Sequence, residues 1–366
     1  MKILHVIDSM NMGGGQSLIV ELAPVQRDFG NEVAVLQLVD SVDKKLIEKL
    51  EDNGIKVLAL SKQRSVRSLR NIFDLIPYLR QYDIVHVHLF PANYWVAIAK
   101  LISFCKVPIV TTEHSTDNKR RKIKIFKYLD SFIYKRYQAV IACADKAKET
   151  FEECYKSVNC LSIPNGVNIS KYIDAVPYTK KELIGIADDS FVVTMVARFV
   201  PSKRQDTIVR SIAQLPDKFH AVFVGGGKDD QGLIKVKKLA QDLGVLERIH
   251  FLYLRSDVPR ILKSSDAVVM SSEYEGLSLS SIEGMACGHP FIASDVNGLR
   301  EVVAGAGILV KCADADELSR VIMKLNDDIS YRNEVTQKCQ IRAAQFDIKP
   351  VAEKYISVYS QFVSNK

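Results

Sequence analysis

Two glutamates bracket a short stretch of small and apolar residues in the second half of the sequence. Glu275 and Glu283 lie eight positions apart, and only glycine, leucine, isoleucine and serine separate them. Amides in such a turn can bind phosphate oxygens, and carboxylates accept hydrogen bonds from the hydroxyls of a ribose or a sugar. We expect Ser280 or Ser281 to cap a helix that carries Glu283 near its first turn. A capping box would explain Glu283 but would leave Glu275 without a role.

Two cations in the segment MVARFVPSKRQD, residues 195–206, could bind the phosphates of the same ligand. Arg198 stands at the end of a predicted strand, and Lys203 is predicted to open the next helix, after Pro201 and Ser202. Cations are mildly unfavourable in the first turn of a helix because they add to the positive end of its dipole. Their position therefore favours an anion-binding role over a merely solvated surface.

The loop after the first predicted strand contains three consecutive glycines, residues 13–15, whose amides can approach ligand oxygens closely. The dinucleotide-binding pattern G-x-G-x-x-G fails here, because Leu18 stands where its third glycine would be. Asp40, at the end of the second predicted strand, keeps a nicotinamide-dependent oxidoreductase open as an alternative. A tight turn between strand and helix also explains the glycines.

Three histidines in the first half differ in their predicted roles. His86 and His88 point to one face of a predicted strand, and no third ligand at metal spacing accompanies them, so we interpret them as packed strand histidines. His114 follows the apolar strand at residues 108–112, where side chains can enter a ligand site. We therefore keep His114 as a candidate functional residue.

Short apolar, β-branched runs alternate with helical patterns along the whole chain, which is typical of α/β domains with mainly parallel sheets. Strands are predicted at residues 2–7, 32–39, 56–60, 83–89, 108–112, 139–143, 191–197, 220–225, 248–254, 267–271 and 290–294. Helices are predicted near residues 16–29, 43–53, 67–81, 92–104, 121–137, 145–155, 203–214, 231–243, 257–264, 279–287, 314–326 and 330–345. A turn-rich stretch from IPNGV to Ser190 separates the two arrays. We therefore predict an α/β fold with two doubly wound, Rossmann-like domains that face each other across a cleft.

The composition is that of a globular protein, with 47% hydrophobic and 25% charged residues. Residues 118–137 hold eight Lys and Arg against Asp130 alone, and the rest of the chain is balanced at 42 basic and 42 acidic residues. The net charge of +7 is therefore local, and it gives no support to nucleic-acid binding. No run reaches the roughly 18 apolar residues of a membrane span, and seven cysteines without a C-x-x-C pair suit a reducing cytoplasm.

Several motifs, in this order along the chain, resemble those of retaining glycosyltransferases of the GT-B fold, family 4 (glycosyl transferases group 1). They are the glycine loop, VTTEH, IPNGV, VARFVPSK, FVGGG, DVP with SSDAVVMSS, EGLSLSSIE and GHPFIASDVNGLREVV. The resemblance covers essentially the whole length, and EGLSLSSIE is similar to the E-x7-E motif of that family. It implies transfer of a sugar from a nucleotide-sugar donor to an acceptor hydroxyl with retention of the anomeric configuration.

The resemblance also implies a role for each matching residue. Glu283 would hold the ribose hydroxyls, Glu275 the donor sugar near its C3 and C4 hydroxyls, and Arg198 and Lys203 the diphosphate. The stretch Gly276, Leu277, Ser278 and Leu279 would supply amides to the phosphates. His114 would contact the region of the sugar 6-hydroxyl or help at the reaction centre, and Gly14 and Gly15 would let the donor approach. No metal and no cofactor is expected beyond the donor, for which we expect a UDP-sugar ahead of a GDP- or ADP-sugar.

The resemblance also suggests three parts of the chain: residues 1–168 on the acceptor side, 169–345 for the nucleotide-sugar, and a helix at 346–366 that returns to the first domain. One departure from the family pattern is FLYLRSDVP, where Leu254 and Arg255 follow a strand that relatives often end with glycine. That loop lies near the nucleotide base in the family. A sugar-nucleotide epimerase or a non-catalytic binding protein of the same fold stays open as an alternative.

The basic segment predicts an acceptor or membrane surface on the first domain. Its cations include Arg120, Arg121, Lys122, Lys124 and Lys127. Ile123, Phe126, Leu129, Ile133 and Tyr137 recur at helical spacing and predict one apolar face. Attraction to anionic lipid would place the protein in the cytoplasm at the inner face of the membrane, where a lipid-linked or glycan acceptor would be met. A basic rim that attracts a soluble anionic acceptor is the second interpretation.

Overall fold

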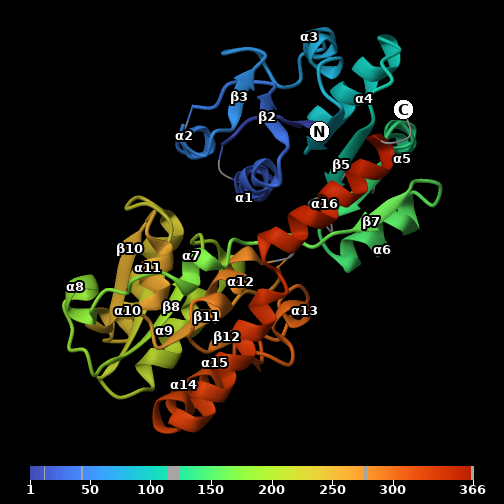
Figure 1. The fold of residues 1–366 in the computed structure, drawn as a ribbon. Coiled ribbons are helices and arrows are strands. Elements are labelled where there is room, and N and C mark those ends of the chain that lie inside the picture. Colours follow the sequence, from blue (N-terminus) through green and yellow to red (C-terminus); the bar gives the residue numbers. More distant parts are fainter. Residues whose placement is uncertain (12, 43, 114–123, 276–277, 364–366) are drawn as a thin grey trace. The chain divides into compact units, whose positions relative to one another are not determined.

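The computed structural model describes residues 1–11, 13–42, 44–113, 124–275 and 278–363. The chain divides into two compact units. The first unit holds Met1–Gly166 together with Ile348–Lys366, and the second unit holds Val167–Asp347 (Figure 1). The domain limits predicted from the sequence, 168 and 345, lie two residues from the observed ones, 166 and 347. The predicted α/β fold with two doubly wound units is confirmed.

A parallel sheet of seven strands forms the centre of the first unit, in the order β3-β2-β1-β4-β5-β6-β7. Its strands are β1 (Lys2–Ile7), β2 (Glu32–Gln37), β3 (Lys56–Ala59), β4 (Ile84–His88), β5 (Ile109–Glu113), β6 (Ala139–Ala142) and β7 (Cys160–Ser162). Strands of a parallel sheet are covered on both faces, and the runs KILHVI and IVHVH are accordingly buried along almost their whole length. The edge strand β7 was not predicted from the sequence.

Helices cover both faces of this sheet. They are α1 (Gly14–Asp28), α2 (Lys45–Asp52), α3 (Arg70–Leu79), α4 (Ala92–Ile102), α5 (Lys124–Tyr134), α6 (Asp145–Cys154) and α16 (Ile348–Val363). One apolar core joins α3, α4, α5 and α6 to the sheet, and a second joins α1, α2 and α16 to its other face. The last helix, drawn red in Figure 1, packs beside α1 and buries Tyr355 and Tyr359 completely. The C-terminal helix therefore completes the core of the first unit.

The exposed side of α5 differs from the one that the spacing predicts. Ile133 and Tyr137 are buried as expected, but Leu129 is exposed. Asp130, the only acid of the basic segment, is buried instead and accepts hydrogen bonds from the hydroxyls of Tyr94 and Tyr155. Two tyrosine donors from α4 and from the residue after α6 thus draw the carboxyl group inward. The predicted apolar face was wrong at Leu129, and the outer face carries no acid between Phe126 and Tyr137.

The second unit contains a parallel sheet of six strands in the order β10-β9-β8-β11-β12-β13. Its strands are β8 (Phe191–Val196), β9 (Phe219–Val224), β10 (Ile249–Tyr253), β11 (Ala267–Met270), β12 (Phe291–Ser294) and β13 (Ile308–Val310). Chain order reverses at the pair β8 and β11, so this pair is the switch point of the sheet. The ligand of an open doubly wound sheet binds outside the carboxyl ends of the strands at such a point.

The helices of the second unit again lie on both faces of its sheet (Figure 1). They are α7 (Ser170–Ile173), α8 (Lys180–Ile184), α9 (Gln205–Ala213), α10 (Gln231–Asp242), α11 (Val258–Lys263), α12 (Leu279–Ala286), α13 (Arg300–Val303), α14 (Ala315–Asp327) and α15 (Ile329–Ala344). The short α7 and α8 lie in the predicted linker, which is therefore not free of structure and belongs to this unit from Val167 onward. Among the residues described here, no helix combines the length and the apolar character that crossing a membrane requires.

Candidate functional site

The turn after β8 carries the two predicted phosphate-binding cations. Arg198 is exposed, and its side chain has no hydrogen bond or ion pair to any residue that the structure describes. Pro201–Lys203 form a single 3-10 turn, and Arg204 then adopts a left-handed conformation with φ 51° and ψ 42°. The helix α9 begins only at Gln205, so the prediction that Lys203 opens this helix was wrong. The left-handed residue breaks the helical path between Lys203 and α9.

The strained backbone of Arg204 is held by its own side chain. Its guanidinium forms two hydrogen bonds with the carboxylate of Asp206, at 2.9 and 3.0 Å, and a third with Glu273 at 2.9 Å. These two acids raise the pKa of Arg204 above its ordinary value. A non-glycine residue in this region costs about 1–3 kcal/mol and persists only where its surroundings hold it. The ion pairs with Asp206 and Glu273 supply that support.

The ends of β8 and β11 are joined by further hydrogen bonds. Ser271, directly after β11, donates from its hydroxyl to the backbone oxygens of Lys203 and Arg204, at 3.0 and 2.9 Å. The backbone N–H of Glu273 donates to the oxygen of Ser202 at 2.8 Å. The turn that carries Lys203 is therefore fixed to the loop that carries Glu275.

Glu275 and Lys203 form an ion pair at this junction, and both side chains are largely buried. Oε1 of Glu275 accepts from Nζ of Lys203 and also from the hydroxyl of Ser272, at 2.8 Å. Ser272 is completely buried at the end of β11. The structure thus brings together two residues that the sequence placed 72 positions apart, in a pairing that the sequence analysis did not anticipate.

The second glutamate lies on α12. Ser278 caps this helix and accepts from the N–H of Ser281 at 3.3 Å, so the prediction that Ser280 or Ser281 is the cap was wrong. Leu279 is the first helical residue, which places the half-buried Glu283 in the second turn rather than the first. Gly276 and Leu277, two of the four predicted amide donors, lie outside the described residues.

Only some of the site residues that were predicted in the first unit lie within the described residues. The helix α1 begins at Gly14, and a Cβ atom on this residue would meet no atom of the described residues within 4 Å. Gly15 is buried. Asp40 forms an ion pair with Lys44 at 2.6 Å, which accounts for this acid without a ribose. His114, Arg120, Arg121 and Lys122 lie outside the described residues, as does the side chain of Lys124.

The loop after β10 has the conformation that glycine would favour, although it contains none. Tyr253, the last residue of β10, has a φ of 55°. Leu254 is exposed, and Arg255 pairs with Asp257 and holds the pKa of that carboxyl below its usual range. Leu254 and Arg255, which depart from the family pattern, therefore change the side chains of this loop. The strand still ends in a left-handed residue, Tyr253.

His86 and His88 are buried as predicted, but a third histidine accompanies them. His5 on β1 lies beside them, and ring nitrogens of the three fall within 4.8 Å of one another. The ring nitrogens form hydrogen bonds with other protein groups: His5 with Gln26 at 2.7 Å and with His88 at 3.0 Å, and His86 with Thr112 at 2.7 Å and with Tyr359 at 2.6 Å. The cluster is therefore a hydrogen-bond network between sheet and helices, and these partners occupy both ring nitrogens of His5 and of His86.

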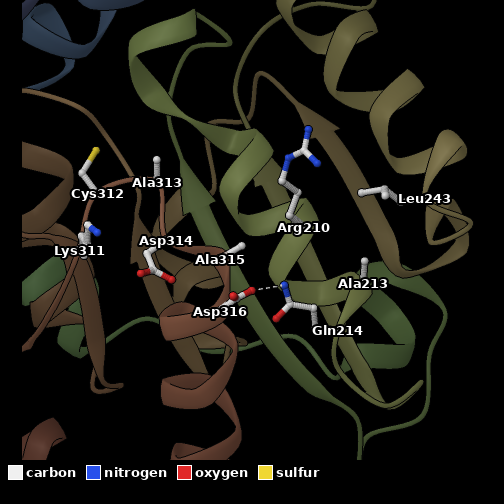
Figure 2. A pocket seen from close by; sticks show the side chains of 10 residues that line it. All are labelled: Arg210, Ala213, Gln214, Leu243, Lys311, Cys312, Ala313, Asp314, Ala315 and Asp316. Carbon is white, nitrogen blue, oxygen red and sulfur yellow. Dashed lines mark hydrogen bonds between the residues drawn. The ribbon is translucent and has the colours of Figure 1, made fainter.

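A pocket of about 580 Å³ lies elsewhere in the second unit, between α9 and the loop from β13 to α14 (Figure 2). Arg210 is one of its lining residues, and Gln214, another of them, donates to Asp316 at 2.7 Å. Neither Lys203 nor Glu275 lines this pocket. Its charges are mixed, with Arg210 and Lys311 near Asp314 and Asp316, so it is not a preformed phosphate site.

Comparisons with known proteins identify the family. The family model Glycosyltransferase Family 4 matches residues 12–171, and the model Glycosyl transferases group 1 matches residues 179–342. The chain is 28% identical, over 100% of its own length and 98% of the relative, to the Escherichia coli UDP-Gal:alpha-D-GlcNAc-diphosphoundecaprenol alpha-1,3-galactosyltransferase. It is 26% identical, over 95% of its length and 90% of the relative, to the phosphatidyl-myo-inositol mannosyltransferase of Mycolicibacterium smegmatis.

Solved structures show the same fold. Anabaena HepE in complex with UDP covers 99% of this chain and 100% of its own, with a TM-score of 0.85 and 23% identity. Sucrose-phosphate synthase from Thermosynechococcus elongatus covers 100% of both chains with a TM-score of 0.77 and 18% identity. Together the two family models cover every strand of both sheets except β1, and all of the motifs that suggested the resemblance. The chain belongs to family 4 of the GT-B glycosyltransferases.

Proposed function

We propose that the protein transfers a sugar from a nucleotide-sugar to a hydroxyl of a lipid-linked or glycan acceptor, with retention of configuration and without a metal ion. The observation that carries this proposal is the convergence of Arg198, Lys203 and Glu275 after β8 and β11. These strands are hydrogen-bonded neighbours at the switch point of the second sheet. Two cations and a carboxylate at that point suit a diphosphate joined to a sugar.

Each charged residue has a defined part in this proposal. Arg198, exposed and without a partner among the described residues, and Lys203 bind the diphosphate. Glu275 accepts hydrogen bonds from the sugar hydroxyls, and Glu283 accepts them from the ribose. The amides at the start of α12, next to the Ser278 cap, add a partial positive charge that suits phosphate oxygens.

The proposed reaction needs no nucleophile from the protein. The bond between the anomeric carbon and the diphosphate oxygen breaks, and its electron pair stays on the nucleoside diphosphate. The acceptor oxygen bonds to the same face of the anomeric carbon, and its proton passes to the departing phosphate. Arg198 and Lys203 stabilise the negative charge that grows on the leaving group, which is the place where fixed cations contribute most to the rate. This charge is the one that a metal ion would otherwise neutralise.

The relatives support a UDP-sugar and a lipid-linked acceptor. The name of the Escherichia coli relative states both a UDP-galactose donor and a diphosphoundecaprenol acceptor, and HepE was solved with UDP. A thermal-shift series with UDP-, GDP- and ADP-sugars tests the donor, because a ligand at 100 times its dissociation constant adds about 2.7 kcal/mol of stability. Proton NMR of the product then compares its anomeric configuration with that of the donor. An inverted product contradicts the proposal.

The proposed diphosphate site is tested by comparing the effects of replacing two exposed arginines, Arg198 and Arg210, on nucleoside-diphosphate affinity. Replacing Arg198 with alanine should weaken nucleoside-diphosphate binding by about tenfold to a hundredfold, since it removes a charged hydrogen-bond donor. Arg210→Ala is the matched control, because Arg210 is also exposed, lies in the same unit and has no partner among the described residues. Equal affinities of the two variants for UDP, GDP and ADP would contradict the assignment of Arg198.

We also propose that the outer surface of α5 docks on anionic lipid, where a lipid-linked acceptor is found. Tyr128, Leu129 and Phe132 are exposed there, together with the cations Lys127 and Arg136. The neighbouring α4 ends in exposed Leu101 and Ile102 and is followed by Phe104, which is 89% exposed. Apolar side chains among cations, with the local acid buried, suit the interface of an anionic bilayer.

Vesicle co-sedimentation tests this surface. Vesicles of phosphatidylglycerol and phosphatidylcholine should sediment the protein, and phosphatidylcholine alone should not. Added salt should weaken the binding, because about 1 kcal/mol per cation near the surface is screened. Tyr128→Ser with Phe132→Ser should reduce sedimentation, whereas Ile341→Ser, which alters an exposed side chain of the second unit, should not. Absence of sedimentation with the anionic vesicles at low salt would leave a soluble anionic acceptor as the reason for the charge.

A further inference from the structure

We propose that Ser272 is a positioning residue for Glu275, and that the ion pair between Glu275 and Lys203 is exchanged when donor binds. The diphosphate takes over Lys203, while Ser272 keeps the carboxylate of Glu275 in place for the sugar. This inference rests on the proposed function of the site. In this inference Ser272 contacts Glu275 throughout, and Glu275 pairs with Lys203 only until the donor binds.

The two oxygens of Glu275 have different surroundings. Oε1 accepts from both Ser272 and Lys203, which occupies the two lone pairs that a carboxylate oxygen offers. Oε2 accepts no hydrogen bond from any residue within the described ranges. The carboxylate is thus held by one oxygen and presents the other. Two adjacent sugar hydroxyls can donate to an oxygen that is free in this way.

The loop itself gives Glu275 little support. Residues 273–275 lie between β11 and α12 and belong to no helix or strand. The backbone N–H of Glu275 donates to the oxygen of Asn297 at 3.4 Å, which is long for a hydrogen bond. The direction of the carboxylate therefore depends on Ser272 and Lys203. Ser272 is the more constant of the two partners, because it is completely buried and is only the second residue after β11.

The side chain of Lys203 can change partner without movement of its backbone. Ser271 holds the backbone oxygen of Lys203 at 3.0 Å, and Glu273 holds that of Ser202 at 2.8 Å. A diphosphate carries more negative charge than one carboxylate and competes for the ammonium group of Lys203. In the absence of a sugar, part of the binding energy of the diphosphate is spent on breaking the Lys203–Glu275 pair. Removing the charge of Glu275 should therefore strengthen the binding of a nucleoside diphosphate.

Affinity for a nucleoside diphosphate tests the exchange. Among UDP, GDP and ADP, the one that the unmodified protein binds most tightly is titrated by calorimetry. Glu275→Gln, which keeps the size of the side chain, should bind it more tightly than the unmodified protein, and Lys203→Met should bind it more weakly. Weaker binding by Glu275→Gln would overturn the exchange, because it would mean that the charge of Glu275 supports the diphosphate site.

Turnover tests the role of Ser272. Ser272→Ala and Ser272→Cys should both lower kcat by about tenfold to a hundredfold, since each removes a strong donor to a charged group. Both should also reduce discrimination between UDP-glucose and UDP-galactose, while nucleoside-diphosphate affinity is retained. The cysteine variant fills the same space, so it separates the lost donor from a packing defect.

Ser265→Ala is the matched control for these variants. Ser265 is also buried, lies just before the same strand, and donates to Thr194 at 2.6 Å, away from the loop. Its kcat should match that of the unmodified protein even if its thermal stability falls. Unchanged kcat and donor discrimination in both Ser272 variants would overturn the positioning role. A failure of the unmodified protein to transfer sugar from any nucleotide-sugar would instead contradict the proposed function.

Discussion

The buried histidine network predicts that the first unit loses stability in mild acid. His5 is completely buried and donates from Nε2 to the amide oxygen of Gln26 at 2.7 Å. Its Nδ1 must then accept from Nε2 of His88, at 3.0 Å, in the neutral form of both rings. A proton added to Nδ1 of His5 would face the N–H of His88. Burial lowers the pKa of His5 from 6.5 to about 4, although the bond to Gln26 opposes this shift.

The size of the effect follows from the difference between the folded and the unfolded pKa. In the unfolded chain the imidazole takes up a proton near pH 6.5, whereas in the folded unit it does so only near pH 4. Between these values the unfolded state binds more protons, so stability falls as the pH is lowered. A difference of about 2.5 pKa units corresponds to about 3 kcal/mol. The stabilisation is complete above pH 6.5 and is lost by about pH 4.

The single tryptophan of the chain makes this loss measurable. Trp95 lies on α4, so its fluorescence reports on the first unit in urea unfolding at several pH values. His5→Gln removes the titrating group and should lose about 3 kcal/mol less than the unmodified protein between pH 7 and pH 4, whatever its stability at pH 7. His250→Gln is the control, because burial also lowers the pKa of His250 to about 4 but in the second unit. Parallel pH profiles for His5→Gln and the unmodified protein would refute the reasoning.

Three further predictions concern the second unit and the reaction. Glu283→Ala should lower nucleoside-diphosphate affinity by about tenfold to a hundredfold, whereas Glu275→Ala should lose turnover without any loss of that affinity; titration and steady-state kinetics of both variants decide this. Transfer should persist in excess chelator, and an absolute requirement for magnesium or manganese would contradict the role of the two cations. Gly225→Ala should destabilise the second unit far more than Gly244→Ala in thermal unfolding. Both glycines have positive φ, which costs alanine about 1–2 kcal/mol, but only at Gly225 would the new Cβ lie 2.1 Å from the oxygen of Ala197.

The order of elements could be predicted from the sequence because buried parallel strands are short apolar runs between helical patterns. Every strand predicted in this way is present. The two strands that were missed, β7 and β13, have only three residues each and lie at sheet edges. So short a run carries too few residues for its periodicity to distinguish it from a loop.

Contacts within the site were less accessible to prediction. The sequence placed Lys203 and Glu275 after strands, but their pairing depends on β8 and β11 being neighbours, which only the sheet order determines. The same limit applies to His5, which joins His86 because β1 pairs with β4. The left-handed turn at Arg204 was not visible either, since its support comes partly from Glu273 in another loop. Each of these contacts and conformations depends on residues that are far away in the sequence.

The return of the chain to its first unit sets the order in which the protein can fold as it leaves the ribosome. The second unit is one uninterrupted stretch, Val167–Asp347, and all its strands and helices have been synthesised before α16 appears. The first unit has its seven strands much earlier, but the face of its sheet that Tyr355 and Tyr359 cover stays open until residues 348–363 have emerged. Domains usually mature in the order of synthesis. Here the first unit, whose strands are synthesised first, cannot complete its core until α16 has emerged. The second unit has its whole sequence before that point.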